Sequence, residues 1–349
     1  MFSGIDLSSD TATRPTAAMK KAMMDAEVGD EQQGEDPTTK KLEERFAELL
    51  GKEAALFLPS ATLANQIALL LHLNRGEELI AAENAHVFFA EGGGPAIFAG
   101  ALARPMDAPS GVFSGEDVRA KFNTARGPGF PISRLVVIEN TTNMGGGIAW
   151  RLSELQSVWS ACEDLGLKCH LDGSRFFNAT TATGQPPAIL AQGFNTVTIC
   201  LSKGLGAGMG AILAMGRDDW DRARRWKQCM GGSLRQSGMF AAAGLYALEH
   251  NIERLAEDHA NARTLAQGLA GIEGLSVETT EPCTNMVFFR LEAPGLAPAH
   301  WQDQCKNKGF RFSRVGPNRF RAVTHLGISS SDINKVIAGA REVLRGQKS

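Results

Sequence analysis

Short, mostly apolar runs alternate with amphipathic helical patterns along most of the chain, and this alternation restricts the possible folds more than any other feature. Four runs are predicted strands, because each is brief and ends at a polar or glycine-rich break. They are 54–58, 135–138, 168–171 and 196–201. The helices predicted among them are 40–50, 62–73 and 153–165, the last opened by a capping box of Ser153 and Gln156. Strands joined by helices favour an α/β fold with a mainly parallel sheet covered on both faces.

The pattern changes after about Asn251. A charged helix is predicted over 256–269, and a last helix carries Ile333, Val336 and Val343 on one face. Short strand-like segments lie between the two helices, at 275–278, 286–291 and 320–323. We therefore expect a large domain over 1–250, with an N-terminal arm over 1–15, and a small α+β domain over 251–349.

Composition excludes several kinds of partner. The 349 residues carry a formal net charge of −2 without a strongly basic stretch, so neither nucleic acid nor an anionic membrane is an expected partner. The start of the chain lacks a secretory pattern, and the apolar runs are too short to span a bilayer, so a cytoplasmic protein is predicted. The six cysteines form no Cys-x-x-Cys pair and the seven histidines form no cluster, so no metal site is expected.

Two residues of opposite charge follow neighbouring predicted strands. Asp172 comes directly after 168–171, and Lys203 comes just after 196–201, in a run with glycines at 204, 206, 208 and 210. Ligands of parallel sheets bind at these carboxyl ends. A desolvated lysine can bind pyridoxal phosphate as a Schiff base, and a carboxylate can keep the pyridine nitrogen protonated. The alternatives are a solvated lysine at a turn and a helix cap at Asp172.

Three further sites fit the same cofactor. Ala61 and Thr62 open a predicted helix, where backbone N–H groups and a hydroxyl can bind a phosphate, although Ser60 also fits a plain N-cap. His86 could stack on the cofactor ring and act as an acid or base there, or be a structural histidine. Arg175 could be a surface residue, or could hold a substrate carboxylate or the phenolic oxygen of the cofactor.

The chain resembles the threonine aldolase family of pyridoxal phosphate enzymes, which have the aspartate aminotransferase fold (fold type I). The similarity covers nearly the full length and rests on specific motifs. They are Ile5–Thr16, Gly34–Thr38, His86 with Glu91–Gly93, His170–Arg175, Leu201–Gly206 and Arg321–His325.

For the cofactor, the resemblance implies that Lys203 forms the covalent bond, that Asp172 pairs with the pyridine nitrogen and that His86 stacks on the ring. It also implies that Ala61 and Thr62 lie on the phosphate. Lys203 and His86 would be the catalytic residues.

For the substrate, the resemblance implies that Ser9, Arg175 and Arg321 hold the carboxylate of an amino acid. Arg235 would reach a phosphate, that of a neighbouring subunit in one arrangement. Members of the family are typically dimers of dimers with active sites at the subunit interface, so a homo-oligomer is expected.

The expected reaction is cleavage of L-threonine, L-allo-threonine or related L-β-hydroxy-α-amino acids to glycine and an aldehyde. The alternative is a racemase or a β-eliminating lyase with the same cofactor and fold. Four positions depart from the usual family pattern: Thr142 stands in place of a histidine, Gln33 of a tyrosine, Ser8 of an arginine and Ala61 of a glycine. Thr142 cannot act as a base near neutral pH, so the choice of substrate at the β-carbon is left open.

Overall fold

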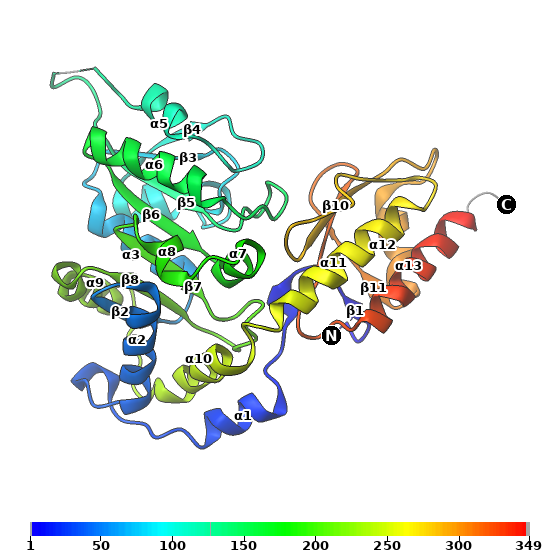
Figure 1. Ribbon diagram of the computed structural model, residues 1–349, viewed down its shortest axis with the longest axis horizontal. Helices are drawn as coiled ribbons and strands as arrows, with labels where there is room; N and C mark the ends of the chain where they lie inside the picture. Colours follow the sequence, from blue (N-terminus) through cyan, green and yellow to red (C-terminus); the bar gives the residue numbers. More distant parts are fainter. Residues whose placement is uncertain (1, 126, 347–349) are drawn as a thin grey trace.

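A seven-stranded sheet forms the centre of the larger part of the molecule in the computed structural model, which describes residues 2–125 and 127–346 (Figure 1). From one edge to the other the strands are β2 (Ala54–Leu58), β8 (Ala211–Met215), β7 (Thr196–Cys200), β6 (Lys168–Gly173), β5 (Ser133–Glu139), β3 (Glu78–Ala82) and β4 (Leu102–Met106). Only β8 runs against both of its neighbours, and the other pairs are parallel. The predicted mainly parallel α/β sheet is confirmed.

Helices cover both faces of this sheet, because alternate side chains of a strand point to opposite sides. In β2, Leu56 packs in the cluster of α3 and α9, whereas Phe57 packs with Phe46 of α2. The helices of this part are α1 (Ala17–Met24), α2 (Pro37–Leu50), α3 (Ala61–His72), α4 (His86–Phe89), α5 (Gly115–Lys121), α6 (Leu152–Leu165), α7 (Phe176–Thr183), α8 (Pro187–Ala191), α9 (Arg217–Cys229) and α10 (Gly238–His250). The short turns of helix are η1 (Asp10–Ala12), η2 (Glu31–Gln33) and η3 (Pro95–Ala99).

A second, antiparallel sheet lies in the C-terminal part, with its own aromatic core. Its order is β12 (Ser313–Arg314), β13 (Arg319–Val323), β10 (Met286–Leu291) and β9 (Leu275–Val277). The helices here are α11 (Leu255–Ala270), α12 (Pro298–Asn307) and α13 (Ser330–Arg345). Phe289 stacks on Phe320 at 5.6 Å, and Trp301 stacks on Phe312 at the same centroid distance. The structure therefore contains a smaller α+β unit, while the division of the chain at residue 250 stays a prediction.

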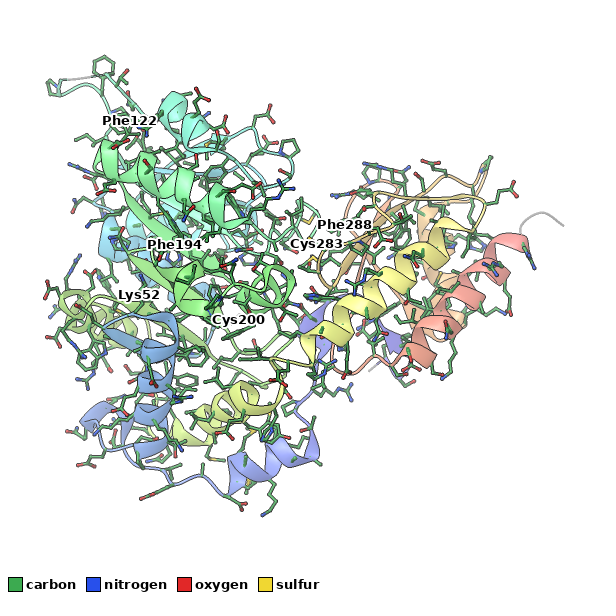
Figure 2. The ribbon with its side chains drawn as sticks, in the orientation of Figure 1. Lys52, Phe122, Phe194, Cys200, Cys283 and Phe288 are labelled. Atoms are coloured by element: carbon green, nitrogen blue, oxygen red, sulfur yellow. The ribbon has the colours of Figure 1, made fainter. Side chains whose placement is uncertain are left out.

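The N-terminal arm joins these two parts. Its strand β1 (Ile5–Asp6) pairs in parallel with β11 (Phe310–Arg311), and Leu7 is buried in the core of the smaller unit. A second join lies across from the arm, where Cys283 donates to the Gly147 carbonyl at 3.4 Å and the Thr284 hydroxyl donates to the same oxygen (Figure 2). Both joins bring parts of the chain that are far apart in sequence to one side of the large sheet.

Lys52 connects the starts of two strands of the large sheet, away from these joins (Figure 2). Its ammonium group donates to the Phe194 carbonyl at 2.6 Å, just before β7 begins (Figure 2). The contact ties the start of β2 to the start of β7, so the carboxyl ends of these strands lie together at the other edge of the sheet.

Most predicted elements are confirmed, and β2 and β10 have the predicted bounds. The predicted capping box of Ser153 and Gln156 is wrong. Helix α6 begins one residue earlier, with Arg151 as N-cap, and Glu154 accepts the Arg151 backbone N–H at 2.8 Å. The capping interaction therefore forms two residues earlier than predicted, between Arg151 and Glu154. Among the helices of residues 2–125 and 127–346, none is both long and apolar enough to cross a membrane.

Candidate active site

Asp172 and Lys203, the two charged residues predicted at strand ends, do lie at the ends of the neighbouring strands β6 and β7, and Glu139 lies next to them. Glu139 at the end of β5 is aligned with Asp172 of β6, and Asp172 is aligned with Thr198 of β7. Lys203 follows β7 by three residues, in a loop where Gly206 has a φ of +79° and donates to the Lys203 carbonyl at 2.9 Å. The parallel register thus places one amine and two carboxylates at the same edge of the sheet.

Asp172 is a buried carboxylate that stays ionised. It accepts hydrogen bonds from the Ser174 hydroxyl at 2.7 Å, the Ser174 backbone N–H at 3.1 Å and the Asn65 amide at 2.9 Å. Burial by itself would raise the pKa of Asp172, but the charges of Lys203 and His86 and the Ser174 bond hold it below its usual value. The alternative of a helix cap is wrong, because α7 begins at Phe176 with Arg175 as N-cap.

Asn65 bridges Asp172 to a second buried carboxylate, Glu91. Its amide nitrogen donates to Glu91 at 2.8 Å, and Gln66 donates to the other Glu91 oxygen at 2.5 Å. Glu91 in turn accepts from Nδ1 of His86 at 2.9 Å, and this bond raises the pKa of His86. The network fixes the imidazole over the strand ends and favours its protonated form.

The side-chain oxygen of Asn65 determines which nitrogen of His170 carries the proton. Because both carboxylates only accept, the Asn65 oxygen must accept from Nε2–H of His170, which lies 3.2 Å away. Nδ1 of His170 then accepts from the Thr196 hydroxyl at 2.8 Å, and burial lowers the pKa of His170 to about 4. A neutral His170 therefore holds the Asn65 side chain in the orientation in which its amide donates to both carboxylates.

His86, Glu91 and Asp172 each present a ligand atom within 4.8 Å of the other two, a spacing that a metal ion could use. The atoms are already engaged with one another, since His86 is bonded to Glu91 and the Asn65 amide lies on both carboxylates. A cation would have to displace the amide hydrogens. The arrangement therefore fits a hydrogen-bonded acid–base group better than a metal centre.

Ala61 and Thr62 are the first two residues of α3, as predicted. Ser60 is the N-cap, and its hydroxyl accepts from the Leu63 backbone at 3.2 Å, so the capping interpretation is also correct. N–H groups in the first turn of a helix have no acceptor within the helix and can bind an anion. The helix passes from this point directly to Asn65, one turn further on.

Arg175 is buried and its guanidinium faces the N-terminal arm. Nε and one terminal nitrogen donate to the two oxygens of Asp10 at 2.7 and 2.8 Å. Burial raises the pKa of a carboxyl, but Arg175 and the nearby Lys203 bring the pKa of Asp10 down to about 2. Asp10 was not among the residues singled out from the sequence, although it stands next to Ser9 in the first motif.

Arg321 makes its hydrogen bonds to neutral oxygens and not to a carboxylate. It donates to the Asn143 side chain at 2.5 Å and to the Ser8 carbonyl at 3.3 Å, while its Nε is buried without a hydrogen-bond partner. Burial, together with the Arg175 charge, lowers the pKa of Arg321 to about 10. A half-buried guanidinium with one unsatisfied, buried nitrogen is suited to a carboxylate ligand.

The other predicted residues have local roles in the chain. Ser9 caps η1, with its hydroxyl accepting from the Thr11 backbone at 3.2 Å. Arg235 is 59% exposed and pairs with Asp30 at 2.9 Å. The exposed Gln33 lies at the end of η2, close in sequence to Asp30.

Thr142 is buried, and its hydroxyl accepts from the Ile148 backbone at 3.0 Å. Its methyl group packs so closely on Gly111 that a Cβ there would approach it to 2.7 Å. The side chain therefore closes the loop over 142–148.

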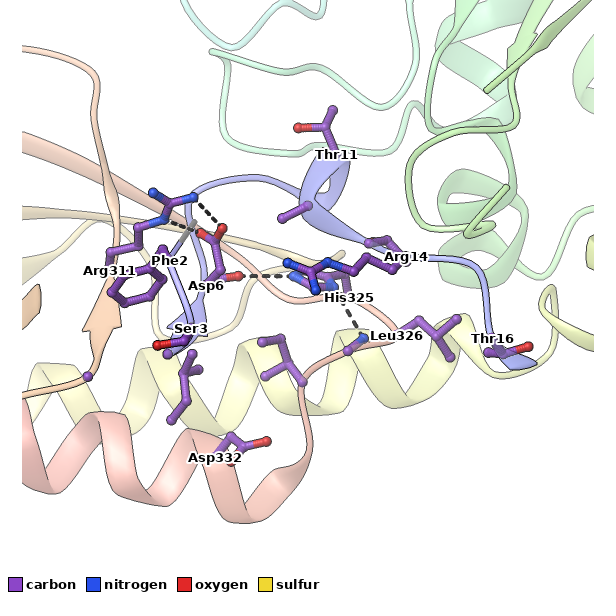
Figure 3. Close-up of a pocket in the computed structure, with 17 residues that line it drawn as sticks. Phe2, Ser3, Asp6, Thr11, Arg14, Thr16, Arg311, His325, Leu326 and Asp332 are labelled. Atoms are coloured by element: carbon purple, nitrogen blue, oxygen red, sulfur yellow. Dashed lines mark hydrogen bonds and ion pairs between the residues drawn. The ribbon is translucent and has the colours of Figure 1, made fainter. Parts of the chain in front are cut away.

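A cavity of about 1010 Å³ lies on the outer side of the N-terminal arm (Figure 3). Its walls come from the arm and the smaller unit. Asp6 makes a two-pronged ion pair with Arg311 at 2.6 and 2.8 Å, and His325 donates to the Asp6 carbonyl at 3.0 Å. These contacts fasten the first half of the arm, as Arg175 fastens the second half.

Comparisons with known proteins agree with this geometry. Residues 6–292 match the family model described as β-eliminating lyase. The low specificity L-threonine aldolase of Escherichia coli K12 is 40% identical over 343 residues, covering 97% of this chain and 99% of that protein. Low-specificity L-threonine aldolase 1 of Arabidopsis thaliana is 36% identical over 338 residues, covering 96% and 94%. Among solved structures, the threonine aldolase of Leishmania major matches with a TM-score of 0.85 at 21% identity, covering 97% and 99%.

Proposed function

The chain belongs to the family of β-eliminating lyases, and we propose that it is a pyridoxal phosphate-dependent aldolase. Its substrates are L-threonine, L-allo-threonine or related L-β-hydroxy-α-amino acids, which it cleaves to glycine and an aldehyde. The observation that carries the proposal is that Lys203 lies close enough to the buried, ionised Asp172 for its charge to lower the pKa of that carboxyl. The identity to low-specificity L-threonine aldolases over nearly the whole chain supports the choice of reaction.

The residues at this edge fit the cofactor. Lys203 supplies the amine for covalent attachment, Asp172 a permanent negative charge for the ring nitrogen, and His86 a ring for stacking. Ala61 and Thr62 offer the open start of α3 to the phosphate. When bound, pyridoxal phosphate supplies an electron sink for the bond that breaks at Cα.

The carboxylate of the substrate binds to Arg321, whose buried Nε needs an acceptor. Ser9 and Arg175 are connected through Asp10, which follows Ser9 in the arm and holds the Arg175 guanidinium in a fixed orientation. Because Asp10 already compensates the charge of Arg175, Arg321 contributes most of the attraction for the carboxylate.

Proton transfer at the β-hydroxyl is assigned to His86. The neutral imidazole is the form that accepts this proton: its Nδ1–H donates to Glu91, so Nε2 carries the free lone pair. The Thr142 hydroxyl is committed to Ile148, which supports a structural role at that position.

The active enzyme is a cytoplasmic homo-oligomer, a dimer of dimers, with the site at a subunit interface. The exposed Arg235 then reaches the phosphate of a neighbouring subunit. Exposed apolar side chains next to His86 support this arrangement, since Phe89 is 53% exposed and its ring lies 6.3 Å from that of His86. Ile97 and Phe98 of η3 are also exposed.

The test is incubation of the purified holoenzyme with L-threonine, L-allo-threonine and both phenylserine diastereomers. Aldol cleavage gives glycine and an aldehyde in equal amounts. The second candidate is β-elimination, which the family description favours, and it gives a 2-oxo acid and ammonia instead. Racemisation leaves the carbon skeleton intact. Absence of glycine from all four substrates would exclude the aldolase.

A further inference from the structure

Glu139 is a buried carboxylate at the site that the proposed reaction leaves without a task. It ends β5 and is 7% exposed. Its Oε2 accepts the backbone N–H of His86 at 2.7 Å, and its Oε1 accepts the backbone N–H of Asn143 at 2.5 Å. One side chain therefore holds two loops that follow different strands.

Each of the two bonded segments leads to a different half of the substrate. On one side is the His86 imidazole, which is assigned to the β-hydroxyl. On the other side the Asn143 side chain accepts from Arg321 at 2.5 Å, and Arg321 is assigned to the carboxylate. Glu139 is thus the common support of the two groups.

We propose that Glu139 is a positioning residue that fixes the distance between His86 and Arg321, so that one substrate meets both. The inference rests on the proposed function. It predicts that loss of one Glu139 acceptor loosens both ends of the site, because each backbone N–H needs its own oxygen. A charge effect on the cofactor alone would leave the Asn143 end unchanged.

The electrostatic surroundings make this support sensitive to acid. Burial raises the pKa of Glu139, and the adjacent Asp172 carboxylate raises it further, whereas the two N–H donors and His86 lower it. Arg175 also faces Glu139, whose charge helps to raise the pKa of that arginine. Protonation turns one accepting oxygen of Glu139 into a donor, so one of the two backbone N–H bonds is lost. Because the pKa of Glu139 is raised, this loss should occur at a higher pH than for a glutamate with the ordinary pKa.

The central experiment compares Glu139→Gln with Glu83→Gln, a matched change at an exposed glutamate directly after β3. Glutamine keeps the shape but has one accepting oxygen, so one N–H loses its partner. We expect Glu139→Gln to lower kcat and to raise KM for L-threonine, each by about tenfold, as for loss of a hydrogen bond to a charged group. Glu83→Gln should leave both within about twofold.

A second variant separates the two ends. Asn143→Ala removes the acceptor of Arg321 and keeps the backbone N–H on Glu139, so it should raise KM by about tenfold with little change in kcat. In the double variant with Glu139→Gln the effects on KM should be clearly less than multiplicative, because both changes act on Arg321.

A measurement on the apoprotein needs no turnover. Amide hydrogen exchange of His86 and Asn143 should be faster in Glu139→Gln than in wild type, and unchanged in Glu83→Gln. Equal exchange in wild type and Glu139→Gln, or multiplicative effects on KM in the double variant, would overturn the inference. If Glu139→Gln does not fold, an unchanged KM in Asn143→Ala overturns it. A wild-type enzyme that yields no glycine refutes the proposed function instead, and the exchange result still decides the role of Glu139.

Discussion

Asp10 and Arg175 face each other across the boundary between the N-terminal arm and the large sheet, joined by hydrogen bonds of 2.7 and 2.8 Å. Both side chains are buried, at 0% and 4% exposure. Asn285 of the smaller unit donates to the same carboxylate at 3.4 Å. One aspartate therefore connects the arm, the strand-end loop and the small sheet at the place where the substrate carboxylate is proposed to bind.

Asp10→Asn should destabilise the protein strongly, because it removes the carboxylate that is hydrogen-bonded to the buried Arg175 guanidinium. Breaking a buried pair from one side costs about 3–5 kcal/mol. The change is measured by urea unfolding of the apoprotein near neutral pH. Asp25→Asn is the control, since Asp25 is exposed and pairs with the exposed Lys21. A loss below about 1 kcal/mol for Asp10→Asn, the range of surface pairs, would contradict the structural role.

Lys203→Ala should abolish turnover and covalent retention of the cofactor. The lysine is the proposed point of attachment. Borohydride reduction followed by peptide mass analysis detects the attachment in wild type. Lys40→Ala, at an exposed position on α2, should retain both properties. Reducible cofactor on another lysine of the Lys203→Ala variant would show that the assignment is wrong.

His86→Ala should lower kcat for cleavage more than Thr142→Ala does. His86 presents Nε2 to the site, whereas the Thr142 hydroxyl is used by the Ile148 backbone. Loss of that internal bond should cost about 1 kcal/mol of stability and have little effect on chemistry. Steady-state rates and urea unfolding of both variants test the difference. Small, equal effects on kcat would point to water as the base.

The His86–Glu91 pair predicts a pH dependence of stability. The Glu91 bond raises the pKa of His86 above its ordinary value of 6.5, so the folded state binds this proton more tightly than the unfolded chain does. Its contribution is therefore complete below pH 6.5 and is lost as the pH rises through the folded-state pKa. Thermal unfolding of the apoprotein across this range should show the loss in wild type. Glu91→Gln should lack it, and an identical pH profile in both proteins would refute the assignment.

Arg321→Lys should weaken substrate binding while the cofactor stays bound. An ammonium group keeps the charge but cannot present two parallel N–H donors to a carboxylate. We expect KM for L-threonine to rise roughly 10- to 100-fold, the range for hydrogen bonds to a charged group. The dissociation constant of glycine, measured spectroscopically, should rise similarly. Arg319→Lys is the matched control on the same strand, since Arg319 pairs with Glu278 at 2.7 Å. Unchanged glycine binding in Arg321→Lys would place the carboxylate elsewhere.

Local patterns were sufficient for much of the fold. The bounds of β2 and β10 are set by side chains within a few residues of each strand. The motifs around Asp172 and Lys203 likewise include the residues at which β6 and β7 end. The start of α6 was misplaced because Ser153 and Glu154 are both capable of capping, and the choice depends on the backbone direction at Arg151. Such a choice is not encoded in residue type alone.

The sequence by itself determined the class of fold, the positions of Lys203 and Asp172 at strand ends, and the start of α3 near Ala61 and Thr62, because each depends on one strand or helix and its end. Only the tertiary structure decided the partners. Asp10 and Arg175 are 165 residues apart in sequence, and Asn143 and Arg321 are 178 apart. No local periodicity relates such residues. They meet because the arm and the small sheet pack against the edge of the large one, and burial there compels each charge to find a counter-ion or an acceptor.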